Sequence, residues 1–159
     1  MPEVVMDACW AFGFLTEVTA EQKKEVIPFV NPKYLMYLIM TDDIHMQSPA
    51  LRLAGNIASG DAEDTQLLLN AGLLKVLASF LQKATEIQKR EVLWILSNIT
   101  AGTMQQISMV INIGFIKYCI TAANNESFIL QSESMWVLCN AINGGTVEQV
   151  GKGRFLIDY

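Results

Sequence analysis

The sequence has few of the residues that catalytic and metal sites require. Its 159 residues include one histidine, His45, and three cysteines, Cys9, Cys119 and Cys139, which do not have the spacing of metal ligands. No nucleophile–base pair, paired buried carboxylates or glycine-rich phosphate loop is recognisable. We therefore expect a protein that is not an enzyme and needs no cofactor or metal. The odd number of cysteines favours buried, reduced thiols in the cytosol or nucleus.

Charge is also scarce, and its balance is acidic. Charged residues make up 17% of the chain and hydrophobic residues 52%, which allows a packed core and argues against disorder. The net charge is −5, so we expect the surface to repel nucleic acid and to attract basic partners. The first residues lack the basic leader of a secretory signal. The most apolar run, residues 34–40, is too short to cross a membrane, so we expect no membrane partner.

Two positions recur every 42 residues, and we call them the ladder. The first position holds Trp10, Arg52, Trp94 and Trp136, and the second, four residues later, holds Phe14, Asn56, Asn98 and Asn140. A period of this length is typical of helical repeat proteins, and armadillo and HEAT repeats span about 40–47 residues. Strand signals are weak. The sequence therefore predicts an all-α solenoid with three helices in each 42-residue repeat.

The repeats can be divided into predicted helices. First helices are expected at 21–29, 63–70 and 104–112, second helices at 33–40, 72–82 and 114–123, and third helices at 3–16, 47–59, 88–101 and 130–143. The predicted units are 1–18 (third helix of an incomplete repeat), 19–60, 61–102 and 103–144 (repeats), and 145–159 (a truncated or divergent tail). We expect Gly60, Gly102, Gly144 and Gly145 to end the third helices in the left-handed conformation.

The third helices carry the predicted binding face. At about 100° per residue, Trp94 and Trp136 both fall among small and polar residues. These are Glu91, Ser97, Asn98, Glu133 and Asn140, whereas the opposite, apolar faces hold Val92, Ile95, Leu96, Ile99, Val137, Leu138, Ala141 and Ile142. A single tryptophan more often packs in a core or between repeats. Three in one register, each in a small or polar stripe, favour a binding surface instead.

The side-chain types on this face suit an extended basic peptide. Asparagine amides carry both a donor and an acceptor and can hold a peptide backbone of any sequence. Tryptophan faces suit aliphatic stems that end in a cation, and nearby carboxylates can pair with that cation. The predicted peptide-binding residues are Asp7, Trp10, Arg52, Asn56, Ser59, Glu91, Trp94, Ser97, Asn98, Glu133, Trp136 and Asn140.

These motifs resemble the importin-α (karyopherin-α) family over roughly residues 1–150. The similar segments are Asp7–Ala11, Pro49–Arg52, Gly55–Ile57, Trp94, Ser97–Gly102 and Gly144–Gln149. The order of the ladder residues is similar to that of the family's repeats five to eight. The resemblance implies a right-handed armadillo superhelix and an adaptor for nuclear import, present in cytoplasm and nucleus. It also implies that the ladder is the family's minor site for Lys/Arg-rich nuclear localisation signals, and that importin-β binds only if the missing N-terminal segment is supplied.

The chain departs from the family at two positions. Phe14 stands where the family usually has tyrosine, and Ala62 stands where it has an acidic residue that helps to hold a lysine, a role that the neighbouring Asp61 is expected to take. Two other functions remain open: a catenin-like armadillo scaffold with a basic groove, and a truncated chain that competes for cargo without carrying it. Solenoid ends without polar caps expose apolar faces, so we also expect end-to-end self-association.

Overall fold

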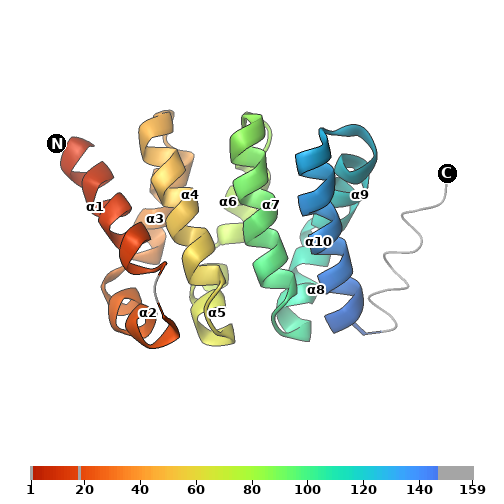
Figure 1. The fold of residues 1–159 in the computed structure, drawn as a ribbon, viewed down its shortest axis with the longest axis horizontal. Coiled ribbons are helices and arrows are strands. Elements are labelled where there is room, and N and C mark those ends of the chain that lie inside the picture. Colours follow the sequence, from red (N-terminus) through yellow and green to blue (C-terminus); the bar gives the residue numbers. More distant parts are fainter. Residues whose placement is uncertain (1, 18, 147–159) are drawn as a thin grey trace. The chain divides into compact units, whose positions relative to one another are not determined.

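The computed structural model describes residues 2–17 and 19–146, and all regular structure in this part of the chain is helical (Figure 1). The predicted tail lies outside it from residue 147 onward. The elements are α1 (Pro2–Leu15), α2 (Ala20–Val26), the 3₁₀ helix η1 (Ile27–Phe29), α3 (Pro32–Met40), α4 (Ile44–Ala58), α5 (Ala62–Asn70), α6 (Leu73–Phe80), α7 (Glu86–Thr100), α8 (Met104–Ile113), α9 (Phe115–Asn125) and α10 (Phe128–Gly144).

The all-α prediction is confirmed, and every predicted helix is present to within a few residues. One predicted helix is split. The segment expected at 21–29 is α2 followed by η1, and the break falls at Pro28, which has no amide N–H to continue the α-helical hydrogen bonds. The division of the chain into repeats remains a prediction, as does the right-handed superhelix.

The first helix of each predicted repeat begins with the same hydrogen-bonded arrangement. Thr19, Asp61 and Thr103 are the N-caps of α2, α5 and α8, and each forms a capping box with the residue three positions later. In a capping box the two side chains satisfy backbone N–H groups that the helix itself leaves without a partner. The 42-residue period therefore extends to the residues that start these helices.

The prediction of left-handed glycines is wrong for all four positions, Gly60, Gly102, Gly144 and Gly145. Among the described residues, a positive φ occurs only at Gly72 (95°) and Gly114 (94°), which follow the first helices. Gly60 and Gly102 serve a different purpose. A Cβ atom at either position would collide with the terminal oxygen of the capping side chain of the next helix, Asp64 or Gln106, so the absence of a side chain leaves room for the capping box.

Replacing Gly114 with alanine is expected to lower the free energy of unfolding by about 1–2 kcal/mol, because a Cβ atom is strained at this φ. No atom lies within 4 Å of the added Cβ, so the cost is conformational alone. Gly13→Ala is a control with the opposite sign. Gly13 lies inside α1 with open space around its Cβ, and alanine there should stabilise the helix by about 0.5–1 kcal/mol. Urea denaturation of both variants tests the pair; equal shifts would contradict it.

The chain divides into two compact units, Met1–Lys83 and Ala84–Tyr159. In the first unit α4 packs against α1 and α3, and α3 also packs against α6. In the second unit α10 packs against α7 and α9. Within each unit, neighbouring third helices thus lie side by side, which brings their ladder positions together.

The predicted apolar faces of the third helices are largely buried. All four apolar residues predicted opposite Trp94 are fully buried: Val92, Ile95, Leu96 and Ile99. On α10, Val137 and Ala141 are buried and Leu138 is half-buried. Ile142 is exposed and does not belong to the core as predicted, since the described helices that pack on α10 are α7, α8 and α9. The predicted buried face of α7 is thus confirmed, and that of α10 is confirmed in part.

No single helix in the described residues is both long and apolar enough to span a membrane. Helices α8 and α9 reach the required length and composition only as a pair that is bent by 72°, and buried helices of a core have the same property.

Candidate functional site

In the second unit the ladder lies on adjacent faces of α7 and α10. Trp136 is 61% exposed, and Trp94 is half-buried. The amide Nδ2 of Asn140 donates a hydrogen bond to the backbone oxygen of Ser97 at 3.0 Å, and the Ser97 hydroxyl donates to the oxygen of Trp94 at 2.8 Å. The asparagine therefore joins the two third helices directly beside their tryptophans.

The first unit repeats this arrangement between α1 and α4. Asn56 Nδ2 donates to the backbone oxygen of Gly13 at 2.9 Å and to the Thr16 hydroxyl at 3.2 Å. Both N–H bonds of the amide are thus used inside the protein, and Asn56 is only 5% exposed. A bound peptide would meet Asn56 through its carbonyl oxygen alone. Sequence reasoning missed this internal bond, although asparagine recurring every 42 residues could have suggested it.

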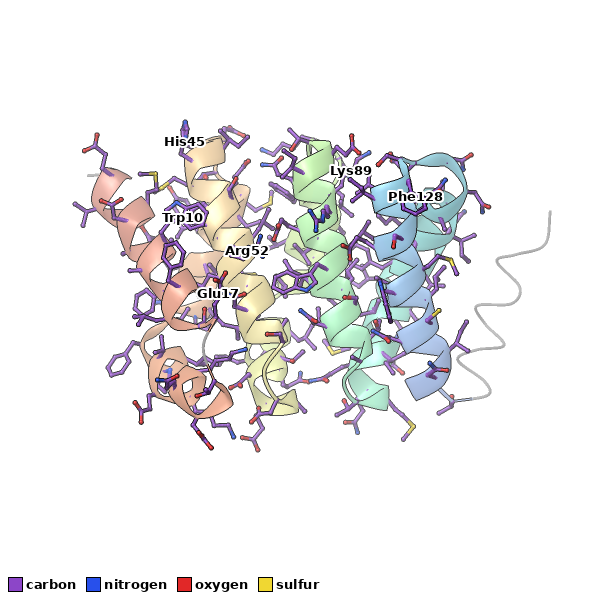
Figure 2. The ribbon with its side chains drawn as sticks, viewed as in Figure 1. Trp10, Glu17, His45, Arg52, Lys89 and Phe128 are labelled. Carbon is purple, nitrogen blue, oxygen red and sulfur yellow. The ribbon has the colours of Figure 1, made fainter. Side chains whose placement is uncertain are left out.

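The aromatic part of the first unit's ladder is on α1. Trp10 and Phe14 are exposed and stack on each other, with ring centroids 6.0 Å apart and an interplanar angle of 27°. Figure 2 shows Trp10 and Arg52 along the neighbouring helices α1 and α4, and Arg52 is half-buried. Asp7 is exposed on α1. This unit therefore presents an aromatic pair, a carboxylate and a cation, whereas the second unit presents two tryptophans and two carboxylates.

A buried lysine, Lys23, forms hydrogen bonds near the C-terminal end of α4, next to the ladder residue Asn56. Lys23 Nζ donates to the backbone oxygen of Asn56 and to the hydroxyl of Ser59, both at 2.9 Å, and Ser59 donates to the same Asn56 oxygen at 2.8 Å. Burial lowers the pKa of Lys23, while Asp64 opposes that shift. A cation at the C-terminal end of a helix is favourable. Sequence reasoning missed Lys23, because the equivalent positions hold Thr65 and Ile107 and give no periodic signal.

Two acidic residues of the second unit, Glu91 and Glu133, lie three positions before the ladder tryptophans, and we count them as part of the ladder from here on. They differ in their partners. Glu133 is 22% exposed, and its Oε1 lies 3.5 Å from Nε of Arg90. Glu91 and Asn98 are half-buried on α7. The expected replacement of the acidic residue at position 62 by Asp61 finds no support, since Asp61 caps α5 and pairs with Lys24 at 2.8 Å. The hydrogen bond from Lys24 is the main reason that the pKa of Asp61 is lowered.

Two further features lie apart from the ladder. An open apolar cavity of about 270 Å³ lies in the first unit between α1 and α3, lined among others by Val5, Cys9, Phe12 and Leu35. No group of three histidine, cysteine, aspartate or glutamate side chains in the described ranges is placed to hold a metal ion.

Comparisons by sequence and by structure both find known proteins that are similar to this chain. No protein-family profile matches the chain. It is 36% identical over 96 residues to importin subunit alpha-1a of Oryza sativa subsp. japonica, which covers 60% of this chain and 18% of that protein. It is 41% identical over 59 residues to importin subunit alpha-B of Dictyostelium discoideum, covering 37% and 11%. The chain therefore spans less than a fifth of the curated relatives that it matches.

Two of the similar solved structures are designed proteins. A designed armadillo repeat protein in complex with the peptide (KR)4 has a TM-score of 0.90 and 28% sequence identity, covering 98% of this chain and 65% of that one. A computationally designed armadillo repeat protein for modular peptide recognition has a TM-score of 0.89 at 24% identity, with the same coverage, and shows the fold alone.

Helix triplets of this period, with the ladder on adjacent third helices, define the chain as an armadillo-repeat protein. Proteins of this class act as binding scaffolds rather than as enzymes. Within this class, the sequence relatives that the chain is similar to are importin-α subunits, and the similarity to the rice protein covers 60% of this chain.

Proposed function

We propose that this chain binds extended segments rich in lysine and arginine, of the nuclear localisation signal type, on the ladder faces of its third helices. The observation that carries the proposal is the exposure of Trp136 beside Asn140 and Glu133. A large aromatic ring that is exposed to water leaves apolar surface unburied. The aliphatic stem of a bound basic side chain would cover that surface. Cation–π attraction at such a site is worth about 0.5–2 kcal/mol.

The spacing of the helices suits an extended ligand. Packed helices lie about 8–10 Å apart, and an extended peptide rises about 3.3 Å per residue. Each third helix therefore meets about three residues of the ligand. The residues proposed to contact it are Arg52, Asn56, Ser59, Trp10 and Asp7 in the first unit, and Glu91, Trp94, Ser97, Asn98, Glu133, Trp136 and Asn140 in the second.

The relatives support the same class of ligand. The designed armadillo protein that is 28% identical to this chain holds a peptide of alternating lysine and arginine. The importin-α relatives support a role as an adaptor for nuclear import, in cytoplasm and nucleus. In that role importin-β is a further proposed partner. End-to-end self-association belongs to the same proposal, because large apolar side chains such as Val4 and Ile142 are exposed on α1 and α10.

The alternatives predict different surfaces. A catenin-like scaffold for acidic partners needs a basic groove, and Glu133 on the ladder together with the net charge of −5 disfavours it. A chain that binds cargo without transporting it would have the same ladder, so only transport measurements in cells separate that alternative from an adaptor.

Titration of a fluorescein-labelled (KR)4 peptide with the chain, followed by fluorescence anisotropy, tests the proposal. We expect a dissociation constant on the order of micromolar at low salt. Affinity should fall at physiological ionic strength, where charges are screened over about 8 Å. A peptide with every lysine and arginine replaced by alanine should not bind. Equal affinity for both peptides, or no binding by a chain whose circular dichroism is helical, would contradict the proposal.

A further inference from the structure

One of the two acidic residues on the second unit's ladder already has a basic partner inside the protein. Arg90 on α7 and Glu133 on α10 approach within 3.5 Å, Nε to Oε1. Arg90 is 59% exposed, so its side chain lies at the surface and can move away without loss of core packing. Glu133 lies three residues before Trp136, where we propose that it pairs with a cation of the ligand.

Arg90 is special to α7. The equivalent positions on the neighbouring third helices hold Ser48 on α4 and Ser132 on α10, neither of which carries charge. A cation four residues before the ladder tryptophan is therefore not a requirement of the repeat. It occurs on α7, which is the third helix that packs beside Glu133 in the second unit.

We infer that Arg90 is a specificity-determining residue that competes with the ligand for Glu133. This inference rests on the proposed function. A lysine or arginine of the ligand that approaches Glu133 meets a carboxylate whose charge Arg90 already partly neutralises, and the nearby guanidinium repels it. Pairing with Glu133 is therefore weaker for the ligand unless Arg90 moves away. Arg90 therefore weakens the binding of basic ligands in general. The loss is largest for ligands with few cations, because they have less binding energy to offset the weaker contact with Glu133.

A neighbouring ion pair supplies a matched control. Lys89, next to Arg90 on α7, pairs with Glu126 at 2.7 Å, and Glu126 lies before α10 and outside the ladder. Replacing either Lys89 or Arg90 with glutamine removes one positive charge from the same turn of α7. Only the change at Arg90 frees a ladder carboxylate. A difference between the two variants thus separates competition for Glu133 from a general change in charge.

The experiment measures the affinity of the labelled (KR)4 peptide for the full chain and for Arg90→Gln, Lys89→Gln, Glu133→Gln and the double variant Arg90→Gln/Glu133→Gln. Exposed ion pairs are weak, so we expect Arg90→Gln to bind about two- to fivefold tighter than the unchanged chain. Lys89→Gln should change the affinity by less than about 1.5-fold. In the Glu133→Gln background, the gain from Arg90→Gln should fall to the size of the Lys89→Gln effect.

The outcomes separate the inference from the function on which it rests. Equal gains at Arg90 and Lys89, or a gain at Arg90 that persists without Glu133, would overturn the competition while leaving basic-peptide binding intact. Weaker binding by Arg90→Gln would instead make Arg90 a residue that positions Glu133. If neither the unchanged chain nor any helical variant binds the peptide, the proposed function fails and this inference fails with it.

Discussion

Replacing both Trp94 and Trp136 with alanine is expected to weaken binding of a Lys/Arg-rich peptide by about 100-fold while the chain stays helical. Each ring would lose its cation–π attraction, about 0.5–2 kcal/mol, together with the contact that covers the aliphatic stem of a basic side chain. A combined loss of about 3 kcal/mol corresponds to two powers of ten in affinity. Fluorescence anisotropy with the labelled (KR)4 peptide measures the affinity, and circular dichroism measures the helix content.

Two further variants make this test specific. Trp136→Ala alone should cost about tenfold in affinity with little effect on folding, because its ring is mostly exposed. Phe128→Ala is the matched control, since Phe128 is 83% exposed on the same helix but lies in its first turn, away from the ladder (Figure 2). Unchanged affinity in the double tryptophan variant, or an equal loss from Phe128→Ala, would remove the ladder as the binding face.

Alkaline pH is expected to destabilise the second unit through Cys119. Burial raises the pKa of this thiol from 9.0 to about 12. Between these values the unfolded chain releases the thiol proton and the folded chain keeps it, so stability is full below pH 9 and is lost as pH rises toward 12. The slope is about 1.4 kcal/mol per pH unit, which gives a loss of about 2 kcal/mol at pH 10.5 and about 4 kcal/mol in full.

Urea denaturation at pH 8 and pH 10.5 measures this loss. Cys119→Ala removes the titrating group, so its stability should fall much less between the two pH values. Part of the fall should remain, because burial also raises the pKa of Tyr118 to about 12. An identical pH dependence in the chain with and without Cys119 would show that the thiol does not contribute.

The sequence was sufficient for the helices and for the register of the ladder, because both follow from periodic patterns. The apolar residues opposite Trp94 are buried as the helical wheel predicts. The helical wheel could not predict that Ile142 is exposed, since burial depends on which helices pack against α10. The left-handed glycines also escaped prediction: Gly60 and Gly114 both follow a predicted helix, but of the two only Gly114 has a positive φ.

Contacts between side chains far apart in sequence were the hardest to foresee. Lys23 bonds to a carbonyl 33 positions away, and the Arg90–Glu133 pair joins residues 43 positions apart. Neither follows a repeated pattern, because the positions equivalent to Lys23 and Arg90 in the other repeats hold uncharged residues. Such contacts depend on rotamers and local packing, which a periodic sequence does not fix.

The hydrogen bonds of Asn56 and Asn140 to the preceding third helix set a rule for redesign. An asparagine that holds two helices together cannot be exchanged freely to suit a new ligand, because any loss of recognition would be mixed with a loss of stacking. The residues three positions before each tryptophan are better choices: a lysine in place of Glu133, for example, would turn the preference of the second unit toward acidic peptides while leaving the asparagine bonds in place. The asparagines that join neighbouring third helices are thus distinct from the acidic positions proposed to select the ligand.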